Sequence, residues 1–200
     1  MKNIITFFCT LCFIVITQTS VAQKANADYS AITDRAEAQL SNTDTIPDFR
    51  SKINQLKLTG IVYQSDGVTP AKDVILFIEQ PDENGNFDLR HADDNRYVFH
   101  RSWVKTDADG RYTFYTFVPG GDRRFNQLQQ IFPLIKAPTQ PAYALETFLF
   151  DEDPLLTRTC RKRMAKKGDP TRVLKPTLKD GILVAERHIT LKTDLDLAEL

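Results

Sequence analysis

The sequence predicts an all-β fold, an antiparallel β-sandwich with one short helix after its penultimate strands. Short segments alternate apolar with polar or aromatic residues at the spacing of β-strands. Clusters of Asp, Asn, Ser and Gly separate these segments and are typical of tight turns. Short strands separated by such turns favour a two-layer sandwich.

The predicted strand series begins at Leu56. Residues 56–63 (LKLTGIVY) alternate in polarity, and residues 73–80 (DVILFIEQ) form an apolar run suited to a strand that is covered on both faces. Residues 111–117 (RYTFYTF) alternate aromatic and Thr side chains. Three further segments complete a series of six or seven strands: residues 130–137, 144–150 and 182–192.

Turn signals lie between these strands, at residues 65–67 (SDG), 83–86 (ENGN) and 107–110 (DADG). One segment, at about residues 153–167 and closed by Gly168, has the composition of a helix. This helix carries Cys160 beside several Arg and Lys residues, which lower a thiol pKa. The sequence places no partner histidine, so we expect a partly buried structural thiol rather than a nucleophile.

The first residues have the organisation of a secretory signal peptide. Lys2 supplies a positive charge, an apolar stretch of about thirteen residues follows, and Ser20-Val21-Ala22 resembles a cleavage site. A retained transmembrane anchor is the alternative, although a spanning helix needs about 20 apolar residues. We therefore expect a protein exported to the periplasm or the extracellular space, without stable membrane insertion after cleavage. The expected organisation is signal peptide 1–22, polar leader or linker 23–55, sandwich domain 56–194 and tail 195–200.

Composition excludes one class of partner. Lys and Arg together number 26, as do Asp and Glu, so the formal net charge is zero. Such a balance gives no general attraction to nucleic acid or to an anionic membrane, and we expect no nucleic-acid partner. Cys9 and Cys12 leave with the predicted signal peptide, so Cys160 alone cannot form an intramolecular disulfide.

Four blocks carry a family resemblance that covers most of the chain from about Leu56 to Lys192. They read LTGIVYQSDGVTPAKDVILFIEQPDENGNF, HRSWVKTDADGRYTFYTFVPG, ETFLFDEDPLLT and DGILVAERHITL. In order and spacing they resemble the intradiol ring-cleavage dioxygenases, the family of protocatechuate and catechol dioxygenases. The resemblance implies a β-sandwich of the intradiol dioxygenase type. In that family the fold holds a non-haem Fe(III) ion that two tyrosines and two histidines bind, and the enzymes use O2 to open catechol rings.

The resemblance also identifies the positions that match the four iron ligands. They are occupied here by Phe87, Asp122, Gln130 and Phe132. A phenyl ring has no lone pair for a metal, and an amide is a weak ligand beside imidazole, so Asp122 is the one competent donor. We therefore expect no Fe(III) and no catalytic or metal-binding residues at these positions. Arg101 lies where relatives carry an arginine near the site, so a residual site would consist of Asp122, Gln130 and Arg101.

The same positions have a structural interpretation. In a strand, residues 130, 132 and 134 face one way, so Phe132 is expected to project into the space that iron and substrate occupy in relatives. Phe87 and Phe132 would then fill that space, each well buried and close to the other or to Asp122. Pro133 lacks an N–H group and indicates an edge position or a bulge.

Three functional hypotheses follow from these residues. The first is an exported, non-catalytic binding or structural module whose ligand or protein partner is unknown. The second is an aromatic ring-cleaving dioxygenase with a rearranged metal site, or a different metal held by Asp122, His91 and Asp93. The third is a sandwich that binds carbohydrate or protein through an exposed aromatic surface. Candidate residues for that surface are Tyr97, Phe99, Trp103, Tyr112 and Tyr115, although such residues are more often core.

Overall fold

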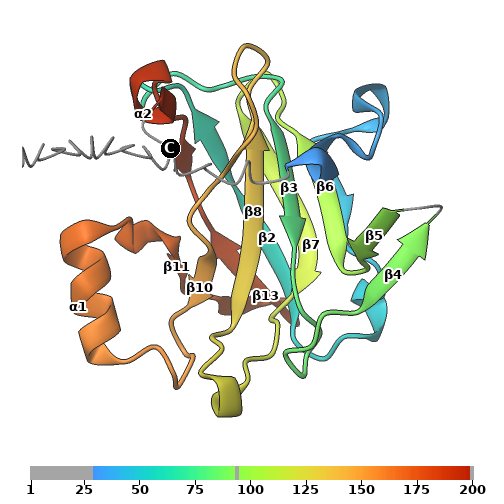
Figure 1. Cartoon of the computed structure of the whole chain (residues 1–200), viewed down its shortest axis with the longest axis vertical. Helices are drawn as coiled ribbons and strands as arrows, with labels where there is room; N and C mark the ends of the chain where they lie inside the picture. The colour runs from blue at the N-terminus through green and yellow to red at the C-terminus, as the bar shows by residue number, and fades with distance from the viewer. Residues whose placement is uncertain (1–28, 93–94, 199–200) are drawn as a thin grey trace, which may run out of the picture.

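The computed structural model describes residues 29–92 and 95–198, which fold as two β-sheets packed face to face (Figure 1). The expected all-β sandwich is thereby confirmed. The first sheet has the order β1-β7-β2-β13-β12, and β14 also pairs with β2. Its strands are β1 (Thr43–Thr45), β2 (Gln55–Tyr63), β7 (Arg111–Phe117), β12 (Thr177–Lys179), β13 (Ile182–Glu186) and β14 (Ile189–Thr190).

The second sheet has the order β11-β10-β8-β3-β6, and β9 also pairs with β8. A separate two-stranded ribbon, β4 with β5, stands beside β6 (Figure 1). The strands of the second sheet are β3 (Ile75–Glu79), β6 (Arg101–Lys105), β8 (Gln130–Lys136), β9 (Tyr143–Ala144), β10 (Phe148–Phe150) and β11 (Val173–Leu174). Those of the ribbon are β4 (Leu89–Ala92) and β5 (Asn95–Val98).

Strand direction departs in part from the antiparallel expectation. Most neighbouring strands are antiparallel, but β1 with β7, β13 with β2, β14 with β2 and β10 with β11 run parallel. Parallel neighbours cannot be joined by a tight turn and need a crossover connection. All strands of the second sheet lie between β2 and β13 in the sequence. This long segment is the crossover connection between the two parallel strands.

The main core lies between the sheets. In β2, Leu56, Leu58 and Val62 are buried and alternate with half-exposed residues, as the sequence pattern predicts. In β8 the inward positions include Ile131 and Ile135, which belong to the same core. The alternate residues of β8, Gln130, Phe132 and Leu134, therefore face away from the space between the sheets.

Residues 29–55 form part of the fold, and the interpretation of this region as a leader or linker is wrong for them. Three short 3₁₀-helices, η1 (Ser30–Thr33), η2 (Glu37–Gln39) and η3 (Phe49–Ser51), flank β1. Ile32 and Leu40 pack with Phe77 and Trp103 on the outer face of the second sheet. The segment was not recognised as structural because its one strand has only three residues, which are polar and pair with a distant strand.

β1 also joins the two sheets. It pairs with β7 of the first sheet, while the Asp44 carboxylate accepts hydrogen bonds from Ser102 Oγ at 2.7 Å and Trp103 N at 3.0 Å in the second sheet. The predicted signal peptide, residues 1–22, and residues 23–28 lie outside the described residues.

The expected helix is present but shorter than residues 153–167. α1 (Arg158–Lys167) begins after Thr157, whose side chain accepts a hydrogen bond from Cys160 N. Asp153 precedes the helix and is instead buried in a turn, where its carboxylate accepts from Gln129 N at 2.7 Å and Leu155 N at 2.8 Å. Cys160 is exposed, so the expectation of a partly buried thiol is wrong. The second α-helix, α2 (Asp194–Ala198), overlaps the expected tail.

Within the described ranges, 29–92 and 95–198, no helix combines the length and apolar character that crossing a lipid bilayer requires.

Candidate functional site

Two loops bring Phe87 and Asp122, which the resemblance matches to iron ligands, to one end of the sandwich. Phe87 follows the loop after β3, and Asp122 lies in the loop after β7. These loops adjoin, because Gly120 N donates to Asp82 O at 2.8 Å and Gln127 Nε2 donates to Gly85 O at 3.0 Å. Family topology therefore predicts this juxtaposition correctly.

Phe87 and Phe132 lie against each other, with ring centroids 5.7 Å apart. This confirms their predicted proximity. Their predicted burial is wrong, since Phe87 is 37% exposed and Phe132 is half-buried. The physical reason is the alternation in β8, which directs Ile131 rather than Phe132 into the core between the sheets.

Pro133 lies within β8, which has neighbours on both sides rather than at a sheet edge. On one side β3 pairs with β8 from Phe132 to Lys136, whereas on the other side β10 pairs up to Ile131 and β9 pairs from Leu134. Pro133 falls at the break between these two partners, where a missing N–H group costs no ladder hydrogen bond. Pro133 therefore lies not at a sheet edge but beside the gap between β10 and β9.

Asp122 serves the local structure of its loop. It precedes the 3₁₀-helix η4 (Arg123–Phe125), and its carboxylate accepts hydrogen bonds from Arg124 N at 2.8 Å and Arg124 Nη2 at 2.9 Å. The hydrogen bonds from Arg124 lower the pKa of the Asp122 carboxyl. Gln130 begins β8 and is half-buried. With two phenyl rings and one carboxylate that Arg124 already engages, the four side chains do not fit the tyrosine and histidine set of a ferric site.

Metal-ligating clusters are also lacking elsewhere in the described part of the chain, where no group of three or more His, Cys, Asp or Glu residues has a metal-binding arrangement. His91 lies exposed on β4, and its proposed partner Asp93 falls outside the described residues.

Arg101, the third member of the expected residual site, has a different partner from Asp122. Its Nη1 donates to Asp34 Oδ2 at 2.6 Å, and its guanidinium carbon lies 4.0 Å from the ring centroid of Tyr97. Asp122 pairs with Arg124 instead, so the residual site of Asp122, Gln130 and Arg101 does not form as one cluster. Arg101 belongs to a neighbouring cavity.

That cavity, which we call the Glu79 cavity, lies on the outer face of the second sheet and has a volume of about 780 Å³. Tyr29, Ala31 and Asp34 of the N-terminal segment form one wall, and the β4–β5 ribbon forms another. The floor comes from three strands of the sheet and consists of Phe77, Glu79, Arg101, Phe132 and Leu134.

Strand register places the floor residues in rows. Glu79 of β3 is paired with Arg101 of β6 on one side and with Phe132 of β8 on the other. Side chains that are directly opposite in neighbouring strands lie on the same face and within contact range. The first row therefore consists of a cation, Arg101, an acid, Glu79, and an aromatic ring, Phe132. The next row, with Phe77 at its centre, is Trp103, Phe77 and Leu134.

Glu79 contributes a carboxylate to the floor of the cavity. It is half-buried, and within residues 29–92 and 95–198 its carboxylate has no hydrogen-bond or ion-pair partner. Burial raises the pKa of Glu79, and the nearby Arg101 charge opposes part of that shift. Sequence reasoning missed this residue. The available signal was an acidic side chain in an otherwise apolar strand, on the same face as Phe77.

The aromatic residues proposed as a binding surface do not form one surface. Tyr112 is 1% exposed and lies in the core between the sheets, whereas Trp103 is 4% exposed and lies beneath the N-terminal segment. Of the five, only Tyr97 lines the Glu79 cavity. His188 is part of the strand framework, because its Nδ1 accepts a hydrogen bond from Ile61 N at 3.1 Å.

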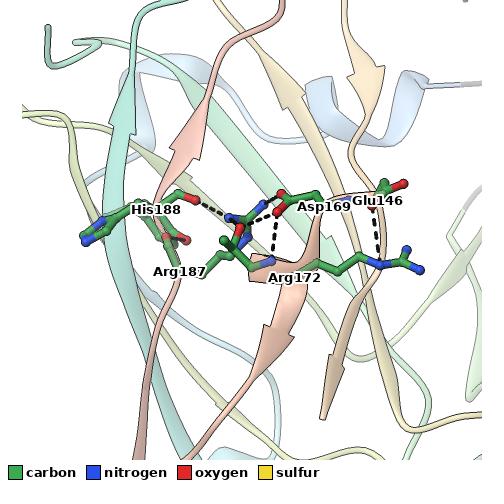
Figure 2. A network of polar contacts seen from close by, with 7 residues as sticks. Glu146, Asp169, Arg172, Arg187 and His188 are labelled. Atoms are coloured by element: carbon green, nitrogen blue, oxygen red, sulfur yellow. Dashed lines mark hydrogen bonds and ion pairs between the residues drawn. The ribbon is translucent and has the colours of Figure 1, made fainter. Parts of the chain in front are cut away.

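A second polar region lies beside β13 and β14 and lines a cavity of about 940 Å³ (Figure 2). Arg187 donates to the Asp169 carboxylate, to Thr171 Oγ1 and to His188 O. The Glu146 carboxylate accepts from Asp169 N at 3.1 Å and lies 3.4 Å from Arg172 Nε. We call this group the Arg187 network, which comprises Glu146, Asp169, Thr171, Arg172, Arg187 and His188.

Comparison with solved structures identifies the fold as intradiol dioxygenase-like. The dioxygenase domain of a dioxygenase carbohydrate-binding protein fusion from Streptomyces sp. SirexAA-E matches with a TM-score of 0.56 at 21% identity, over 71% of this chain and 82% of that one. The intradiol ring-cleavage dioxygenase from Tetranychus urticae matches with a TM-score of 0.53 at 16% identity, over 78% of this chain and 90% of that one.

The 3-chlorocatechol 1,2-dioxygenase from Rhodococcus opacus 1CP matches with a TM-score of 0.53 at 18% identity. This match covers 74% of the present chain but only 62% of the Rhodococcus enzyme. No protein-family model and no curated protein sequence matches the chain. At these sequence identities the similarity establishes the fold alone, and any function must be argued from the residues of the site.

Proposed function

We propose that this intradiol dioxygenase-like protein is a non-catalytic module that binds a ligand in the Glu79 cavity, and that it acts after export. The observation that carries the proposal is the contact between Phe87 and Phe132, whose rings pack 5.7 Å apart at two of the four positions that match iron ligands. Two side chains without lone pairs occupy the place where the family's chemistry requires two donors.

The other two positions support the same conclusion. Asp122 uses its carboxylate to cap η4 and to pair with Arg124, so binding a metal would break these bonds. Gln130 offers an amide, which is a poor substitute for imidazole at Fe(III). Neither residue compensates for the two phenyl rings.

A binding role is supported by the cavity beside these residues. It lies within the volume range of small-molecule sites and combines apolar walls with a few polar groups. Its half-buried carboxylate at Glu79 has no partner among the described residues, as expected of a group that a ligand completes.

Metal content and oxygen uptake test the loss of catalysis. Protein lacking residues 1–22 is purified, its iron is quantified, and oxygen consumption is followed with catechol and with protocatechuate. We expect colourless protein without bound iron and no oxygen uptake above the background. Stoichiometric iron together with oxygen-dependent ring opening would contradict the proposal and support the alternative of a rearranged dioxygenase site.

A restored ligand set provides the positive control. The variant combines Phe87→Tyr, Asp122→Tyr, Gln130→His and Phe132→His. Because Phe87 and Phe132 are partly exposed, the new side chains can be accommodated without burying unpaired polar groups in the main core. We expect this variant to take up Fe(III) and become coloured while the unmodified protein does not.

Export is tested separately. N-terminal sequencing of protein recovered outside the cytoplasm should give Gln23 as the first residue, and a sequence that still begins at Met1 would contradict cleavage of the predicted signal peptide.

A further inference from the structure

We propose that the Glu79 cavity binds an uncharged polyhydroxylated ring, such as one sugar unit of a saccharide, through paired hydrogen bonds to Glu79 and Arg101. This inference rests on the proposed function, because it assigns a ligand class to the same cavity. Its support comes from the arrangement of donors, acceptors and apolar walls around the two side chains.

Glu79 and Arg101 present complementary groups side by side. They are opposite residues of β3 and β6, yet they do not form an ion pair within 4 Å in the described structure. Among the described residues the carboxylate accepts no hydrogen bond, and the guanidinium, which has five N–H donors, forms a hydrogen bond only through Nη1, to Asp34. A hydroxyl group donates and accepts at once, so adjacent hydroxyls of one ligand can satisfy both residues.

The charges in the cavity favour an uncharged ligand. The charged lining residues are two acids, Asp34 and Glu79, and two bases, Arg96 and Arg101, so the lining as a whole has no net charge that would attract an ion. An anion placed at the floor would also face the carboxylate of Glu79. A neutral ligand with several hydroxyls avoids this repulsion and still supplies the hydrogen bonds that Glu79 lacks.

The walls accommodate the carbon skeleton of such a ring. Phe132 flanks Glu79 on the side opposite Arg101, and Phe77 and Leu134 continue the apolar floor. Tyr97 and Leu89 of the ribbon complete an enclosure of about 780 Å³, which is larger than a single six-membered ring requires. The combination of an apolar wall and a few convergent polar groups is the usual composition of a site for an amphipathic small molecule.

The chain contains a natural reporter for this site. Trp103 is the single tryptophan of the sequence, and it lies in the row next to Glu79. The guanidinium carbon of Arg101 is 5.0 Å from the Trp103 ring centroid. A ligand that moves Arg101 therefore changes the surroundings of the only indole, and its fluorescence reports binding directly.

The test is a fluorescence titration of the protein lacking residues 1–22 with glucose, galactose, mannose, cellobiose and maltose, and in parallel with catechol and benzylamine. We expect a saturable change with at least one saccharide. Glu79→Gln, which removes the charge but keeps the shape, should weaken that binding about tenfold or more. Glu186→Gln, a control on an exposed carboxylate of the first sheet, should leave it unchanged.

Thermal unfolding of the same variants separates binding from structure. Glu79→Gln should raise the unfolding temperature while it weakens binding, because it removes an unpaired half-buried charge. Equal saccharide affinity in Glu79→Gln, or no saturable change with any saccharide, overturns the inference. Saturation by catechol or benzylamine alone overturns the saccharide class but leaves a non-catalytic binding site, whereas iron-dependent oxygen uptake overturns the proposed function itself.

Discussion

The Glu79 cavity and the Arg187 network are both hollow, polar regions that contain carboxylates and arginines, but they differ in how their charges are satisfied. In the Arg187 network, Asp169 accepts from Arg187 and Thr171, and Glu146 accepts from Asp169 N–H and pairs with Arg172 (Figure 2). In the Glu79 cavity the carboxylate at the centre of the floor has no partner among the described residues. A cluster whose carboxylates are partnered by its own arginines and N–H groups holds the fold together, whereas an unsatisfied carboxylate in a cavity is available to a ligand.

The backbone around the Arg187 network is as constrained as its side chains. Tyr112 Oη donates to the Arg187 carbonyl oxygen at 2.6 Å, which ties β7 to the segment after β13. That carbonyl also approaches Gly60 of β2 so closely that a Cβ atom at residue 60 would lie 1.9 Å from it. Five substitutions test the contrast between this rigid region and the open cavity.

Among substitutions in the Arg187 region and the Glu79 cavity, Gly60→Ala should have the largest effect, a loss of about 3 kcal/mol in the free energy of unfolding, because the added methyl group must displace the Arg187 backbone. Urea denaturation measures this loss. Gly168→Ala is the matched control: its Cβ would meet the Glu146 side chain at an ordinary 3.4 Å, so its effect should stay within about 0.5 kcal/mol. Similar effects of the two substitutions would contradict the rigidity of the Arg187 region.

Arg187→Met should cost about 2 kcal/mol, since it leaves Asp169 without its cationic partner while it keeps most of the side-chain volume. The estimate allows for the partial exposure of Asp169. Arg111→Met is the control, because Arg111 is largely exposed and its ion pair is weak, with Nε 4.0 Å from Asp109 Oδ2. If both substitutions have equally small effects, the Arg187 network is not structural.

Phe132→Ala should cost about 1 to 2 kcal/mol, because this half-buried ring lines the cavity and packs against Phe87. Phe114→Ala removes a ring that is 1% exposed in the core between the sheets, and it should cost about 3 to 5 kcal/mol. Chemical denaturation of the two variants compares the regions directly. Equal losses would mean that Phe132 is a core residue and that the cavity is closed.

Glu79→Gln should have the smallest effect at pH 7, a gain of roughly 0.5 kcal/mol, because the Gln side chain carries no charge to desolvate. Burial raises the pKa of Glu79, so the folded state binds its proton more tightly than the unfolded state does. The stability linked to Glu79 is therefore fully present below its unfolded pKa near 4.5 and is lost as pH rises through the folded value. The gain from Gln should vanish near pH 4.

Asp169→Asn should show the opposite sign in the same experiment. Burial alone would raise the pKa of Asp169, but the hydrogen bonds from Thr171 and the charge of Arg187 outweigh it and lower that pKa. Its stabilisation is present above the unfolded pKa near 3.8 and is lost only as pH falls through the lower folded value. Unfolding free energies at pH 7 and pH 4 should therefore show a penalty for Asn that largely persists at pH 4, where the gain from Glu79→Gln has disappeared.

The sequence predicts the strands that have their own periodicity. β2, β3, β7 and β8 were identified because each alternates or forms an apolar run long enough to recognise. β1 was missed, since Thr43-Asp44-Thr45 is polar and depends on pairing with β7 far along the chain. Local pattern carries no information about such a partner.

The site was predictable only in part. The resemblance correctly brought Phe87 and Phe132 together, but period-two alternation alone does not say which face of β8 the second layer covers. Sequence reasoning had no ground to single out Glu79, because its role depends on the lack of an ion-pair partner among the described residues. That lack is a tertiary feature: Arg101, which lies opposite Glu79 in the neighbouring strand, pairs with Asp34 instead. Cavity walls from residues 29–34 were likewise unexpected, because they approach Glu79 through tertiary packing alone.

The parallel pairing of β2 with β13 has a consequence for how the chain folds. It joins Leu56 to Leu183, so the middle of the first sheet is completed by segments from near the two ends of the described domain. Contacts between residues so far apart in the sequence slow folding, because the entropy of closing the intervening loop is lost before the strand pairing contributes its stabilising free energy. Until β13 arrives, β2 presents an unpaired edge, and a chain that ends before Ile182 keeps that edge permanently open to association with other chains.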